Sequence, residues 1–241
     1  VYCSDCCRDY EHNISINIPL PEFSYAQAVE QKWTARSTLN AFLDMAGCFD
    51  YRAEGGINTG ISFPADDDNV IPVLDGDWFT DDITGRFREF LRVTFGEKHY
   101  EENLAFIEKA IGKDIRKYFI KDFYNDHVKR YKKRPIYWLF SSPRGSFNAL
   151  IYMHRYTPDT VSIVMNEYLR EFQTKLATEK ALQEAIEASS SSSPAEKAKA
   201  TKKLDTIRKT IKELEDYERD ILYPLATRQI EIDLDDGVKA N

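Results

Sequence analysis

The 241-residue sequence contains no long apolar run, which limits the classes of protein that it can encode. No stretch of about eighteen apolar residues is present, so no membrane-spanning helix is predicted. The first residues lack the basic and apolar regions of a secretory signal. These absences predict a cytoplasmic protein. The length is sufficient for the core of one large domain or two modest ones.

Cysteine is scarce, and its pattern is poor for a metal site. The four cysteines are Cys3, Cys6, Cys7 and Cys48. Cys3 and Cys6 have the spacing of a zinc knuckle and His12 lies nearby, but only Cys48 remains to supply a second pair of ligands. Reduced thiols are the simpler interpretation, with zinc as the alternative.

Patterns typical of catalysis or of metal binding are missing. The acidic residues near the middle of the chain are Asp66, Asp67, Asp68, Asp75, Asp77, Asp81 and Asp82. They do not alternate around a central glycine as calcium ligands do, so a solvated loop with favourable charge at a helix start is the simpler interpretation. We interpret His154, after a predicted strand, as structural, with a phosphate or base contact as the alternative. The residues predict neither a metal site nor a catalytic one.

Two aromatic-rich segments with a turn between them predict a β-hairpin. Pro135–Phe140 and Phe147–Tyr152 have strand length and composition. Ser142-Pro143-Arg144-Gly145 supplies the turn, because proline fixes φ and glycine accepts a positive φ. The hairpin therefore carries Arg144 at its tip. Tyr137 and Trp138 point to opposite faces of the first strand, so one of them is expected in the core.

Basic residues surround this hairpin and form the candidate nucleic-acid contacts. They are Lys129, Arg130, Lys132, Lys133, Arg134, Arg144 and Arg155. Positive charge beside aromatic side chains suits a phosphate backbone, and a projecting tip makes Arg144 the candidate for reaching a groove. On the residues alone, a core hairpin preceded by a solvated charge run is the simpler interpretation, and nucleic-acid contact is the alternative. The net charge of −7 and the pI near 5.3 argue against general coating of nucleic acid but allow a local basic surface.

Helical patterns occupy most of the remaining sequence. Amphipathic helices are predicted at 77–95, 100–111 and 114–131, and Val70–Leu74 is a candidate edge strand because Pro72 cannot donate to a ladder. After Pro158, apolar residues at three- and four-residue steps predict two long helices separated by Ser189–Ser193, which we interpret as an antiparallel coiled-coil arm reaching about Leu225. Pro224 should kink or end the second helix.

These elements predict an α+β protein that is mainly α-helical. A helical body with a small antiparallel sheet is followed by a long two-helix arm. The expected domains are an N-terminal helical or irregular segment at 1–62, the body with its hairpin at 63–156, and the arm and tail at 157–241.

Three segments of the sequence resemble a known family. They are RPIYWLFSSPRGSFNALIYMHRY, IPVLDGDWFTDDITGRFREFLRVTFG and RQIEIDLDDGVKAN. They are similar to the C-terminal part of PglX-type adenine-specific DNA methyltransferases of BREX phage-defence systems, which are related to fused restriction-modification enzymes. The resemblance implies S-adenosylmethionine as the cofactor of the parent enzyme. It implies double-stranded DNA, the methyltransferase catalytic domain and other defence-system subunits as partners.

The motifs that such an enzyme needs for catalysis are absent from this sequence. There is no Pro-Pro pair, hence no Asn-Pro-Pro-Tyr motif to hold a flipped adenine. The glycine cluster at 55–60 has the wrong spacing for a cofactor turn. The chain is expected to be a fragment or separate subunit that binds no cofactor and does not methylate DNA alone. Two functions remain: DNA recognition and positioning, or an interaction or spacer module that docks another subunit.

Overall fold

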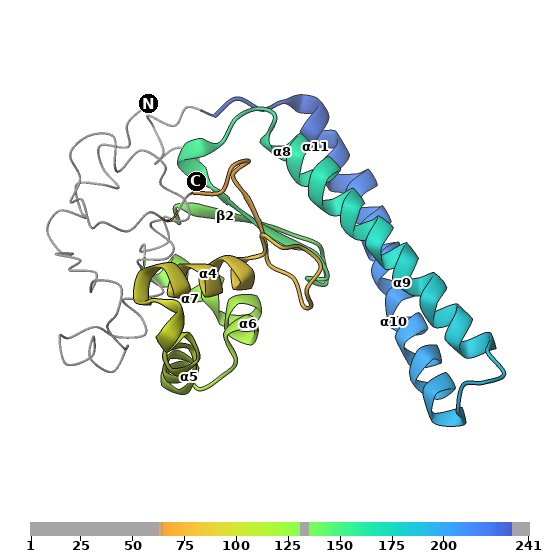
Figure 1. Ribbon diagram of the computed structural model, residues 1–241. Helices are drawn as coiled ribbons and strands as arrows, with labels where there is room; N and C mark the ends of the chain where they lie inside the picture. Colours follow the sequence, from red (N-terminus) through yellow and green to blue (C-terminus); the bar gives the residue numbers. More distant parts are fainter. Residues whose placement is uncertain (1–62, 64, 131–134, 233–241) are drawn as a thin grey trace, which may run out of the picture.

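The computed structural model describes residues 63, 65–130 and 135–232, which form a small sheet, helices around it and a projecting arm (Figure 1). The body contains β1 (Val70–Pro72), α4 (Ile83–Phe95), η2 (Glu97–His99), α5 (Tyr100–Ile111), α6 (Ile115–Tyr118), η3 (Phe119–Phe123), α7 (Tyr124–Arg130), β2 (Tyr137–Ser141), β3 (Asn148–Tyr152) and η4 (Met153–Arg155). The arm contains α8 (Thr160–Ile163), η5 (Val164–Leu169), α9 (Arg170–Ala188), α10 (Pro194–Tyr217), η6 (Glu218–Leu222) and α11 (Tyr223–Arg228). The prediction of a mainly helical α+β fold is confirmed.

The described strands form an antiparallel sheet in the order β1-β3-β2. The predicted hairpin is confirmed, with Tyr137 opposite Tyr152 and Ser141 opposite Asn148. Among the described strands, β1 pairs with β3 alone, with Pro72 opposite Ala149, as expected for a proline-containing edge strand.

Both faces of this sheet are buried, each in a different apolar core. Leu150 and Tyr152 of β3 pack with helices α4 to α7, whereas Ala149 and Ile151 pack with the base of the arm. The alternation follows from the two-residue repeat of a strand. On β2, Tyr137 is fully buried in the first core and Trp138 is partly buried against the second. The prediction that one of this pair lies in the core is confirmed.

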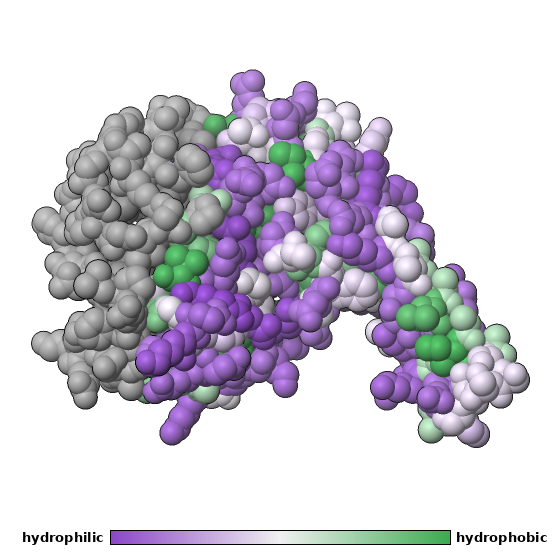
Figure 2. Space-filling view, viewed as in Figure 1, coloured by the Kyte–Doolittle hydropathy of each residue, from purple (hydrophilic) through white to green (hydrophobic). Residues whose placement is uncertain are grey.

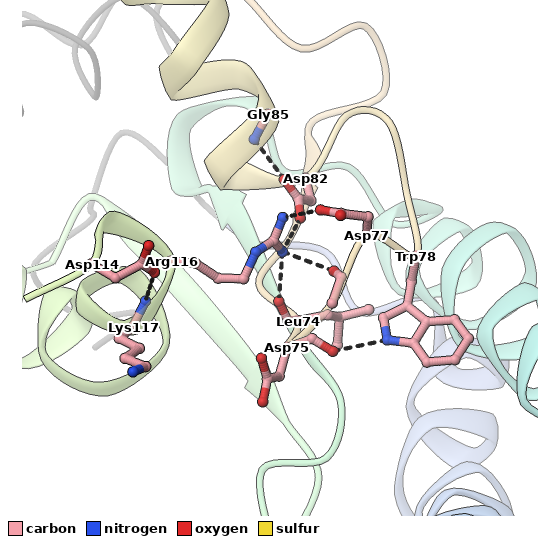
Figure 3. A network of polar contacts seen from close by, with 10 residues as sticks. Leu74, Asp75, Asp77, Trp78, Asp82, Gly85, Asp114, Arg116 and Lys117 are labelled. Atoms are coloured by element: carbon pink, nitrogen blue, oxygen red, sulfur yellow. Dashed lines mark hydrogen bonds and ion pairs between the residues drawn. The ribbon is translucent and has the colours of Figure 1, made fainter. Parts of the chain in front are cut away.

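Helix α4 begins six residues later than the sequence predicted, because the segment before it is organised by an arginine (Figure 3). Arg116 of α6 donates hydrogen bonds to the carbonyl oxygens of Leu74 and Gly76, at 3.0 and 2.8 Å, and forms ion pairs with Asp77 and Asp82. Asp82 caps the helix by accepting from the Gly85 N–H at 2.6 Å.

The arm is an antiparallel helical hairpin, as predicted, with α9 and α10 side by side along its length (Figure 1). The connection at Ser189–Ser193 matches the serine-rich break, and Ser193 and Glu196 form a reciprocal capping box at the start of α10. Of the two outcomes expected at Pro224, a kink or an end of the helix, the end is wrong. The chain passes through the π-helical turn η6 and continues to Arg228 as α11, so the proline follows directly after a local widening of the helix.

Across the described ranges, no helix is both long and apolar enough to cross a membrane.

Candidate nucleic-acid interface

The tip of the β2-β3 hairpin is a tight turn with internal hydrogen bonds. The Gly145 N–H donates to the Ser142 carbonyl at 2.8 Å, and the Ser142 N–H donates to the Phe147 carbonyl at 2.9 Å. Gly145 has a φ of 70°, the left-handed value that glycine accepts without strain. The Asn148 side chain donates to the Gly145 carbonyl at 2.9 Å. The turn chemistry predicted from Ser-Pro-Arg-Gly is therefore realised.

A carboxylate from the arm holds this tip in place. Glu213 of α10 accepts hydrogen bonds from the Ser142 hydroxyl at 2.6 Å, the Ser146 hydroxyl at 2.6 Å and the Arg144 backbone N–H at 2.7 Å. Burial acts to raise the pKa of Glu213, but these hydrogen bonds outweigh it and hold the pKa below its usual value. The ionised carboxylate thus joins the hairpin tip to a helix that lies about seventy residues away in the sequence.

Sequence reasoning did not identify Glu213. It lies beside the apolar seam of α10 and carries no sign of its own that distinguishes it from the solvated acidic residues of the arm. The one signal that could have indicated an acidic partner is the turn itself, because the Ser142 and Ser146 hydroxyls and the Arg144 N–H require an acceptor.

Arg144 presents its side chain outward from this anchored turn. The residue is exposed, and within the described ranges its guanidinium makes no ion pair. Its backbone N–H donates to the Glu213 carboxylate, which is the only partner of Arg144 among the described residues. A cationic side chain is therefore held on a fixed backbone and remains available to a ligand.

Arg155 is placed differently from the other candidate contacts. Its guanidinium donates to the backbone carbonyls of Asp66 and Asp67, at 2.6 and 3.1 Å, and the residue is only half-exposed. This geometry fastens the loop before β1 to the end of β3. Arg155 therefore has a structural role in addition to any contact with a ligand.

Two of the basic residues before β2 lie at the end of α7. Lys129 and Arg130 are exposed on the last turn of that helix, whereas Lys132, Lys133 and Arg134 lie outside the described residues. The Nε2 atom of buried His127 accepts a hydrogen bond from the Tyr137 N–H at 3.2 Å, which joins α7 to the first residue of β2. Burial, assisted by the charge of Arg130, lowers the pKa of His127 to about 4.

His154 packs as the structural interpretation expected. Its ring lies 5.3 Å from the ring of Tyr152, and burial lowers the pKa of the imidazole.

The acidic loop before α4 differs from the solvated loop that the sequence suggested. Asp66 and Asp82 are 5% and 2% exposed, and the Tyr168 hydroxyl donates to Asp68 at 2.8 Å and lies 3.0 Å from Asp81. Burial, together with the hydrogen bond and charge of Asp68, raises the pKa of Asp66 to about 7. Part of the loop is folded inward because Tyr168 and the partly buried Arg86 and Arg116 supply partners for its carboxylates, while Asp67, Asp75 and Asp77 remain exposed.

This loop and the base of the arm line an open pocket of about 700 Å³. Its polar lining is largely paired internally, since Lys175 bonds to Glu171 and to the Trp78 carbonyl, and Arg116 is engaged as described above. Among the described residues, no group of three or more metal-ligating side chains is present. The pocket therefore lies where the body packs against the arm, and we assign it no ligand.

Comparison with known proteins identifies relatives that are adenine-specific methyltransferases. The adenine-specific methyltransferase BrxX of Escherichia coli O9:H4 (strain HS) is 38% identical over 213 residues, or 81% of this chain and 17% of that protein. The adenine-specific methyltransferase PglX of Lacticaseibacillus casei (strain Zhang) is 39% identical over 195 residues, or 75% of this chain and 16% of that protein. No protein-family model matches the sequence.

These relatives confirm the resemblance noted in the sequence, and they define its extent. The chain spans about a sixth of the length of the proteins that it matches. It is homologous to part of the PglX-type adenine-specific methyltransferases.

Proposed function

We propose that this chain is the non-catalytic DNA-recognition and positioning part of a site-specific adenine-N6 DNA methyltransferase. The parent enzyme would act in phage defence or restriction-modification, with S-adenosylmethionine bound by a catalytic domain in another part of that enzyme. The relatives' description as adenine-specific methyltransferases supports this setting. The chain's own sequence contains no Asn-Pro-Pro-Tyr motif, which supports a role in binding rather than in methyl transfer.

The observation that carries the proposal is the anchored hairpin tip. A side chain that reads a base edge must keep its position while the duplex is scanned, and Glu213 fixes the backbone from which Arg144 projects. Arginine suits this task because its guanidinium can bond in a bidentate manner to the O6 and N7 atoms of guanine in the major groove. Lys129 and Arg130 at the end of α7, with the basic residues that follow them, would bind the phosphate backbone.

The acidic net charge does not contradict this proposal. Association with DNA depends on how charge is distributed over the surface, and the candidate residues are concentrated on the hairpin and on the segment that leads into it.

A triple substitution tests the proposal. Lys132, Lys133 and Arg134 are replaced by glutamine in the complete enzyme, and duplex binding is measured over a range of salt concentrations. Each lost phosphate contact should lower the slope of log K against log salt by about 0.9. The matched control replaces three exposed body lysines, Lys98, Lys109 and Lys117, which make no ion pair with any described residue. Equal behaviour of the two triple variants would refute the proposal.

An interaction module is the second candidate, and an exposed side chain on the arm favours it. Leu182 lies on the outer half of α9 and is 54% exposed, so an apolar side chain is available there to a partner. Under this alternative the arm would dock the catalytic domain or another subunit of the defence complex. Two results together would favour the interaction module. The Leu182→Gln variant would fail to assemble with its partner, and the variant of Lys132, Lys133 and Arg134 would bind DNA like the unmodified enzyme.

A further inference from the structure

The second arm helix carries a concentration of positive charge that the hairpin does not explain. Residues 194–212 of α10 contain seven lysines and arginines against two acidic residues, which leaves a formal charge of +5 in a protein whose net charge is −7. Some of these cations are neutralised locally: Lys203 pairs with Glu179, Arg208 with Glu184, and Lys212 with Asp216.

Four lysines of this stretch, Lys197, Lys199, Lys202 and Lys209, form no ion pair within the described part of the chain, and the last three share one face. Lys199, Lys202 and Lys209 are exposed. At 3.6 residues per turn, they fall together with Glu213 within roughly 80° of the helix circumference. The buried seam, which includes Leu204 and Ile207, faces a different direction. The three lysines therefore form a stripe, and we call it the lysine stripe.

Glu213 fixes the direction in which this stripe points. Because its carboxylate contacts Ser142 and Ser146, its face of α10 is turned toward the hairpin tip at the base of the arm. Lys209 is one helical turn farther along the arm, and Lys202 and Lys199 follow. The lysine stripe thus begins close to the turn that carries Arg144 and continues outward for about 15 Å at 1.5 Å per residue.

The arm projects away from the body, so that an open angle lies between them. Figure 1 shows α10 on the side of the outer arm that faces this angle, and Figure 2 shows the angle as a wide hollow between the body and the arm in the space-filling surface. A ligand that contacts both the hairpin tip and the lysine stripe would enter this angle.

We infer that the lysine stripe is a second nucleic-acid contact surface, at which Lys199, Lys202 and Lys209 bind the phosphate backbone of the same duplex that the hairpin tip reads. The inference rests on the proposed function. About 15 Å of duplex axis presents roughly four phosphates per strand at 3.4 Å each, enough to occupy three lysines. A flexible ammonium group binds phosphate as a point charge, without need of a fixed geometry. The arm then serves as a guide that sets the angle of the duplex relative to the hairpin.

The test compares three triple variants in the complete enzyme. Lys199, Lys202 and Lys209 are replaced by glutamine, which preserves helix propensity and removes only charge. The variant of Lys132, Lys133 and Arg134 measures the contribution of the segment before the hairpin. The variant of Lys98, Lys109 and Lys117 is the control for an equal change in net charge. Binding of a duplex that contains the recognition site is measured across about 50 to 200 mM salt.

The inference predicts a lower salt slope for the arm variant, by about 0.9 for each lysine that contacts a phosphate, with discrimination between DNA sequences unchanged. If the variant before the hairpin weakens binding while the arm variant behaves like the control, the inference is wrong and the proposed function stands. If all three variants behave alike, both are wrong. If the arm variant instead disrupts assembly of the enzyme with DNA binding intact, the lysine stripe binds an acidic protein surface and the inference is also wrong.

Discussion

The carboxylate of Glu213 and the hydroxyl of Ser142 are 2.6 Å apart, although one belongs to the arm and the other to the hairpin. Ser142 is itself 3% exposed, and its hydroxyl also accepts a hydrogen bond from the Phe147 N–H at 3.0 Å. The two residues therefore connect the backbone of the turn to α10 through consecutive hydrogen bonds. A change in the position of the arm should be transmitted to the turn that presents Arg144.

Removal of this carboxylate should loosen the hairpin tip. In Glu213→Ala the Ser142 hydroxyl, the Ser146 hydroxyl and the Arg144 N–H lose their shared acceptor, and leaving such groups unsatisfied costs about 1–3 kcal/mol of unfolding free energy. Hydrogen exchange should accelerate at residues 142–147 more than in the rest of the sheet.

Glu213→Gln serves as the matched control for this substitution. The amide oxygen still accepts from the Arg144 N–H, and a serine hydroxyl can accept from the amide nitrogen, so most of the protection should return. Equal exchange at the tip in both variants and the unmodified chain would show that Glu213 does not hold the turn.

Arg144 should affect discrimination more than affinity. If its guanidinium reads a base edge, Arg144→Gln should reduce the free-energy difference between the preferred and the altered base pair by about 1–3 kcal/mol at one position. Competition binding with duplexes altered at single positions measures this difference. Uniform weakening against every duplex would assign Arg144 to the phosphate backbone instead.

Acid should destabilise the chain through His127. The folded pKa of about 4 lies below the ordinary value of 6.5, so the unfolded state binds the proton more readily. The contribution of neutral His127 to the free energy of unfolding is complete above pH 6.5. It is lost as the pH falls toward 4, and the loss approaches roughly 3 kcal/mol. In His127→Gln, the free energy of unfolding measured by chemical denaturation should no longer fall between pH 6.5 and 4 by this amount. An unchanged pH profile would contradict the lowered pKa of His127.

Asp66 should make the chain less stable as the pH rises, which is opposite to the effect of His127. Its folded pKa of about 7 lies above the ordinary value of 3.8, so the folded state binds the proton more readily. The contribution of protonated Asp66 to the free energy of unfolding is present below pH 3.8. It is lost as the pH rises toward 7, and the loss is on the order of a few kcal/mol. Asp66→Asn, measured at the same pH values, should therefore gain relative stability as the pH rises. A parallel profile for variant and unmodified chain would show that Asp66 ionises normally.

The chain alone should bind no S-adenosylmethionine, because its sequence has neither the glycine turn nor the adenine-binding motif of a methyltransferase. Titration calorimetry at micromolar cofactor should record no heat of binding above dilution. A stoichiometric binding isotherm would show that the glycine cluster at 55–60 forms a cofactor turn after all.

Local sequence signals predicted the elements that depend on local physics. The glycine at position 112 and the charge pattern before it define the end of α5, and the serine-rich break separates α9 from α10. The hairpin followed from its turn residues. In each of these cases the residues that determine the structure are neighbours in the sequence.

The errors arose where a distant residue decides the local structure. The start of α4 depends on Arg116, which lies more than thirty residues away and binds the carbonyls of Leu74 and Gly76. The inward folding of the acidic loop depends on Tyr168, and the anchoring of the hairpin tip depends on Glu213. None of these pairings has a periodicity or a spacing that a single sequence reveals.

The central strand β3 has a consequence for how this chain can be divided. Since Leu150 supports the core of the body and Ile151 supports the core at the base of the arm, removal of everything after Tyr156 would leave one side of the strand facing water. A shortened version ending there should aggregate or unfold rather than remain as an isolated domain. An exchange of the hairpin tip between related chains is therefore best attempted by grafting the turn at 142–146 alone, with the strands and the arm kept as one unit.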